Sequence, residues 1–116
     1  MGQRIERQVT RMRLNLPNTI EVDSTLQQLS AVAGGIGWSI STPLCVASHP
    51  ELWPSIGIHP MTRAGFRRSV QLVARRGEFG DLPHQIAKRA TTILQGGSIA
   101  RLCTAHPWVS DLLRWP

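Results

Sequence analysis

Residues 23–43, DSTLQQLSAVAGGIGWSISTP, carry the clearest secondary-structure signals in the chain. This stretch begins with polar residues that favour a helix N-terminus, continues with apolar residues at helical spacing, and stops that helix at three glycines. The Trp-Ser-Ile-Ser-Thr that follows predicts a short buried strand, and the proline after it suits the first turn of a short helix. Residues 19–23 alternate apolar and polar side chains, which predicts a strand before the helix. Residues 19–42 therefore predict a strand–helix–strand unit with a right-handed parallel crossover.

The N-terminus of the predicted helix is the strongest candidate binding site in the chain. A helix N-terminus presents free backbone N–H groups and the positive end of the helix dipole, so it favours a carboxylate or another anion. In a parallel sheet, ligands bind beyond the carboxyl ends of the strands. The alternative is that the polar residues at this point only cap the helix. The binding candidates are Asp23, Ser24 and Thr25 after the first strand, and Ser41, Thr42 and Pro43 after the second.

The rest of the chain alternates predicted helices with predicted strands. Asp81 is an expected helix N-cap, Gly96-Gly97 an expected helix end, and Ser98 the expected N-cap of a further short helix. This alternation predicts an α/β fold with a mostly parallel sheet flanked by helices. Periodicity and turn residues predict helices over residues 3–13 and 82–95, strands over 55–59 and 67–76, and a turn over 77–81.

Length and composition indicate one small domain that binds rather than catalyses. The chain has 116 residues, of which 41% are hydrophobic, and a formal net charge of +6. Its basic residues are scattered, which favours solvated faces over a nucleic-acid-binding patch. No apolar run approaches the ~20 residues that cross a bilayer, and the N-terminus lacks the apolar core of a signal peptide, so we expect a cytoplasmic protein without a membrane partner. The chain contains no nucleophile elbow, catalytic-triad order or phosphate loop, so we expect neither enzymatic activity nor a cofactor.

Two alternatives compete with this interpretation. Cys45 with His49, and Cys103 with His106, could together supply two sulfur and two nitrogen ligands to a zinc ion. The simpler explanation is that both cysteines are reduced, buried apolar residues and that the histidines are exposed, which predicts no metal site. The second alternative is a small basic protein that binds nucleic acid, because the net charge is positive.

Several stretches of the chain, taken in order, resemble one protein family. Their order and spacing resemble the effector-binding domain of LysR-type transcriptional regulators, over roughly residues 3–95. That domain is similar to a type 2 periplasmic binding protein, with two α/β subdomains and a small-molecule effector in the cleft between them. The stretches are RIERQ at residues 4–8, IEVD at 20–23, VAGGIGW at 32–38, TPL at 42–44, GFRR at 65–68, LVARRG at 72–77, and the helix expected at 82–95.

The resemblance implies a sensor rather than a complete regulator. It assigns residues 1–96 to part of the second subdomain of an effector-binding domain and residues 97–116 to a C-terminal helical tail. It implies a small anionic organic effector, held by the hydroxyls and backbone N–H groups of residues 23–25 and 41–43, and a homo-oligomeric parent protein. In this family an N-terminal winged helix-turn-helix binds DNA. Since this sequence contains no such motif, the resemblance implies contact with DNA only through that missing segment.

Overall fold

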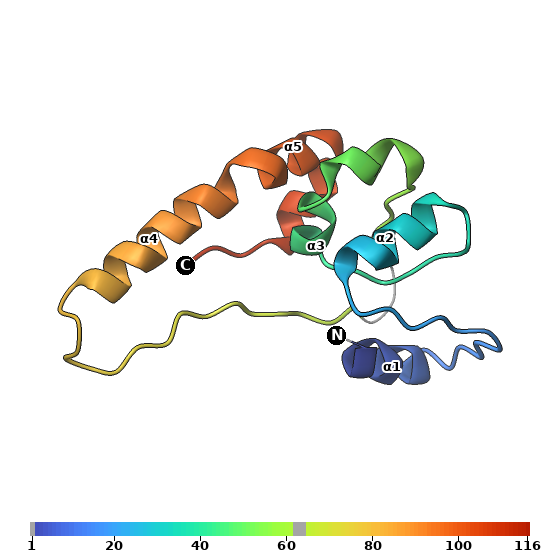
Figure 1. Ribbon diagram of the computed structural model, residues 1–116, viewed down its shortest axis with the longest axis horizontal. Helices are drawn as coiled ribbons and strands as arrows, with labels where there is room; N and C mark the ends of the chain where they lie inside the picture. The colour runs from blue at the N-terminus through green and yellow to red at the C-terminus, as the bar shows by residue number, and fades with distance from the viewer. Residues whose placement is uncertain (1, 62–64) are drawn as a thin grey trace. The chain divides into compact units, whose positions relative to one another are not determined.

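The computed structural model describes residues 2–61 and 65–116, and this part of the chain is helical (Figure 1). Helices account for 51% of the residues, and no described residue lies in a strand. The predicted α/β fold with a mostly parallel sheet is therefore wrong. The helices are α1 (Gly2–Arg11), α2 (Thr25–Ala33), α3 (Pro43–Ala47), the 3₁₀ helix η1 (Pro50–Ser55), α4 (Leu82–Gln95), α5 (Gly97–Ala105) and the 3₁₀ helix η2 (Pro107–Leu112).

The segments predicted as strands lack the neighbours that a strand requires. A strand is stable only when its N–H and C=O groups pair with a neighbouring strand and one of its faces is covered. In the segment 19–23, however, Ile20 remains 69% exposed, and in the segment 67–76 Val73 remains 85% exposed. The alternation of apolar residues is present in both segments, but no ladder of hydrogen bonds forms within the described ranges.

The chain divides into two compact units, Met1–Arg67 and Arg68–Pro116. In the first unit, α2 contacts η1, and a hydrogen bond from the Gln28 side-chain amide to the Ile40 carbonyl (3.2 Å) ties α2 to the segment that precedes α3. The Trp53 indole N–H donates to the Val46 carbonyl at 2.8 Å, which joins η1 to α3. The buried apolar side chains of this unit are Leu29, Ile40, Val46 and Ala47.

In the second unit, α5 contacts both α4 and η2. Ile99 and Leu102 on α5 and Val109 on η2 are the buried apolar side chains of this unit. Leu102 and Val109 are each only 1% exposed, so the interior of the unit lies at α5 and η2. Most of α4 is exposed, and none of its side chains is buried.

The sequence signals at several helix ends are confirmed. Ser24 is the N-cap of α2, Pro43 opens α3, and Asp81 is the N-cap of α4. The predicted turn over 77–81 is also present, and Phe79 adopts a φ of 63° there, in the left-handed region. The expectation for Ser98 is wrong, because α5 begins at Gly97, two residues before the start that a Ser98 cap implies, and its N-cap is Gly96.

No described helix is both long enough and apolar enough to cross a membrane.

Candidate functional site

Ser24 and Gln27 together fix the start of α2. The Ser24 backbone is extended (φ −133°, ψ 153°), and its hydroxyl oxygen accepts a hydrogen bond from the Gln27 backbone N–H at 3.2 Å. The Gln27 side-chain oxygen in turn accepts a hydrogen bond from the Asp23 backbone N–H at 3.2 Å. This arrangement closely resembles a capping box, in which the cap and the third helical residue bond reciprocally. The Ser24 hydroxyl therefore has a structural role in capping, whatever else it binds.

Two backbone donors at the start of α2 remain available to an anion. The Gln27 N–H is used by the cap, and the Gln28 N–H donates to the Ser24 carbonyl at 3.0 Å. Within the described ranges, the N–H groups of Thr25 and Leu26 make no backbone hydrogen bond. These are the groups that a helix N-terminus offers to a carboxylate. Asp23, which is exposed, opposes this use because its own carboxylate would repel an anion.

The second predicted segment reaches α2 through Ile40. The Gln28 side chain donates to the Ile40 carbonyl, and Ile40 itself is buried. In the next residue, the Ser41 hydroxyl oxygen is buried and has no hydrogen-bond partner among the described residues. An unsatisfied buried hydroxyl costs free energy, and a ligand oxygen or N–H could satisfy it.

Thr42 and Pro43 have a local structural role at the start of α3. Thr42 is the N-cap of this five-residue helix with an extended backbone (φ −110°, ψ 156°), but its side chain makes no capping hydrogen bond. Pro43 occupies the first turn, where the lack of an N–H costs nothing. Of the six predicted site residues, Ser24, Thr42 and Pro43 thus lie at helix starts, while Ser41 carries the unsatisfied polar atom.

The cysteines and histidines do not form a metal site in the described part of the chain. Cys45 and Cys103 are half-buried free thiols rather than fully buried residues. The His49 ring lies 3.3 Å from the Glu51 carboxylate, and the His106 ring packs edge-on against Trp108 with their centroids 6.1 Å apart. Across residues 2–61 and 65–116, no three His, Cys, Asp or Glu side chains gather to hold a metal ion. The zinc alternative gains no support from this arrangement.

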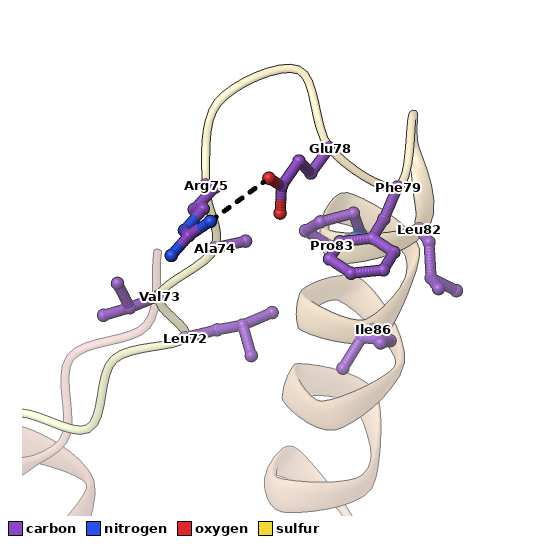
Figure 2. A pocket seen from close by; sticks show the side chains of 9 residues that line it. All are labelled: Leu72, Val73, Ala74, Arg75, Glu78, Phe79, Leu82, Pro83 and Ile86. Carbon is purple, nitrogen blue, oxygen red and sulfur yellow. Dashed lines mark ion pairs between the residues drawn. The ribbon is translucent and has the colours of Figure 1, made fainter.

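The second unit contains a shallow groove that the sequence analysis did not predict. It lies between the segment that precedes the 77–81 turn and the first turns of α4, and it encloses about 480 Å³ (Figure 2). The signal was present as apolar residues on both sides of the turn, but the predicted sheet would have covered them. The lining residues are Leu72, Val73, Ala74, Arg75, Glu78, Phe79, Leu82, Pro83 and Ile86.

No protein family, curated protein or solved structure matches this chain. The similarity to LysR-type regulators therefore stays a prediction carried by the residues quoted above.

Proposed function

We propose that this chain is part of the effector-sensing region of a LysR-type transcriptional regulator. In this proposal the α2 N-terminus and the segment before α3 bind the carboxylate of a small anionic organic molecule. The chain binds and does not catalyse, and DNA recognition belongs to a winged helix-turn-helix outside this sequence. Effector binding would then shift the parent oligomer between two states.

The observation that carries the proposal is the buried hydroxyl of Ser41, which has no hydrogen-bond partner among the described residues and lies next to the Gln28–Ile40 hydrogen bond. That hydrogen bond holds the Ser41 segment against α2. The same helix has two N–H donors, at Thr25 and Leu26, without backbone partners among the described residues. A carboxylate has two acceptor oxygens, so it is suited both to a serine hydroxyl and to helix N–H groups.

The proposal depends on this binding segment and on the resemblance in sequence, and not on the fold. The effector-binding domain of LysR-type regulators is α/β, whereas the described residues of this chain contain no strand. What the chain shares with the predicted arrangement is the order of a nonhelical segment, a capped helix and a second nonhelical segment over residues 14–42.

Binding of benzoate to the purified chain, followed by saturation-transfer NMR on the ligand, tests the proposal. We expect Ser41→Ala to weaken benzoate binding about fivefold, the loss of roughly one hydrogen bond. Ser39→Ala is the matched control, because Ser39 is exposed and lies two residues away. Equal benzoate affinity in both variants and the unmodified chain would exclude Ser41 from the site, and an absence of benzoate binding at millimolar concentration would count against the proposed anion site itself.

A further inference from the structure

The segment 69–74 in the second unit makes no backbone pairing with other described residues. In Figure 1 it runs as an extended trace before the chain turns back into α4. Within the described ranges, residues 69–74 make no backbone–backbone hydrogen bond. All of these residues are exposed. A row of free N–H and C=O groups on an extended backbone is a template for pairing with another extended chain.

The side chains of this segment alternate as they do in a strand. Figure 2 shows Leu72 directed toward the first turns of α4 and Val73 directed away from them. Leu72 faces a groove whose other side is formed by Phe79, Leu82 and Ile86. Leu72 is 54% exposed, so this apolar groove is open to an incoming side chain. An extended peptide beside residues 69–74 could place alternate side chains in it.

The charges around the segment indicate the chemistry of its partner. Arg68 precedes the segment, and Arg75 and Arg76 follow it. Arg75 lies 3.5 Å from Glu78, but both side chains are largely exposed, so this ion pair neutralises little of the positive charge. Pairing with a second copy in antiparallel register about Leu72 would place Arg68 opposite Arg76, and a parallel in-register pair would align identical arginines. Like charges directly opposite each other destabilise a strand pair, so the surface fits an acidic partner.

We propose that residues 69–74 and the adjacent groove bind an extended peptide that has apolar residues in its centre and carboxylates at the end that lies beside Arg75 and Arg76. The peptide pairs its backbone with residues 69–74, places an apolar side chain against Leu72 and Phe79, and sets its acidic end against these two exposed arginines. This surface lies in the second unit and is independent of the anion site proposed on α2. The apolar lining of the groove favours a peptide, which can bury apolar side chains there, over a duplex nucleic acid, which presents a charged phosphate backbone.

Fluorescence anisotropy with a labelled nine-residue peptide tests this proposal directly. The peptide has two glutamates at each end and alternating valine and threonine between them, and a second peptide carries lysines in place of the glutamates. We expect the acidic peptide to bind at least ~10-fold more tightly than the basic one, and its binding to weaken with added salt. A duplex DNA oligonucleotide serves as the third probe.

Two protein variants separate the backbone contribution from the charge contribution. Gln71→Pro removes one N–H donor that the described chain does not use in a backbone hydrogen bond, so circular dichroism stays unchanged while peptide binding falls about fivefold or more. The double variant Arg75→Glu with Arg76→Glu should weaken binding of the acidic peptide about tenfold and strengthen binding of the basic peptide. Arg89→Glu with Arg114→Glu, at two exposed positions in the same unit, is the control for an equal change in net charge.

The outcomes that overturn the proposal are distinct from one another. If the acidic and basic peptides bind with equal affinity, the arginines do not contribute to recognition. If Gln71→Pro binds the acidic peptide as tightly as the unmodified chain, the peptide does not pair with the backbone of this segment. Salt-dependent binding of the DNA duplex without binding of either peptide would replace the proposal with a nucleic-acid surface. None of these results bears on benzoate binding at α2, so the two proposals fail separately.

Discussion

At the scale of single residues, Ser24 holds the N-terminus of α2 through its hydroxyl, which accepts the Gln27 N–H. We expect Ser24→Ala to lower the free energy of unfolding by about 1 kcal/mol, because the first turn of α2 loses its cap. Ser24→Asp retains an acceptor at the same position and should retain most of the stability. Urea denaturation followed by circular dichroism measures the difference, and equal stability of Ser24→Ala and the unmodified chain would contradict the capping role.

Ser41 should behave in the opposite way to Ser24. Its hydroxyl is buried without a partner among the described residues, so Ser41→Ala removes an unsatisfied polar atom and loses no hydrogen bond. The variant should be as stable as the unmodified chain, or more stable by up to about 1 kcal/mol, in the absence of ligand. A loss of more than this in the same denaturation assay would show that the hydroxyl has a structural partner and would remove the reason for placing a ligand there.

At the scale of secondary-structure elements, local signals predicted the helix ends and failed for the strands. The helix starts at Ser24, Pro43 and Asp81 depend on the residue types within one turn, so they can be predicted from the neighbouring sequence. A strand depends on a partner strand that can be distant in sequence. The alternation of apolar residues such as Ile20 and Val22 with polar ones does not show whether such a partner exists. The same distinction applies to the candidate site. The capping role of Ser24 could be predicted because it is local, whereas the Gln28–Ile40 hydrogen bond could not, because its partners are twelve residues apart.

The junction between α4 and α5 depends on a glycine in the left-handed region. Gly97 has a φ of 54°, and no other atom lies within 4 Å of the position that a Cβ would occupy. Gly97→Ala should therefore cost about 1 kcal/mol of unfolding free energy through backbone strain alone. Gly37→Ala is the matched control, because that position is equally open and has no positive φ. If both substitutions change stability equally in urea denaturation, the junction does not require the left-handed conformation.

Across the described part of the molecule, few side chains are fully buried, so each of them contributes strongly to stability. Leu102 is 1% exposed, whereas Ile93 on α4 is 67% exposed. We expect Leu102→Ala to cost roughly 2–5 kcal/mol and Ile93→Ala less than about 0.5 kcal/mol. Thermal and urea unfolding of the two variants measure the difference. A similar small effect for both would contradict the burial of Leu102.

A ¹H–¹⁵N NMR titration of the chain with benzoate tests the anion site residue by residue. We expect the amides of Thr25, Leu26, Ser41 and Thr42 to shift together and to follow a single dissociation constant, while those of residues 69–74 stay in place. Shifts confined to the exposed arginines, or no shifts at residues 24–28 and 40–42, would contradict an anion site formed by the α2 N-terminus and the Ser41 segment.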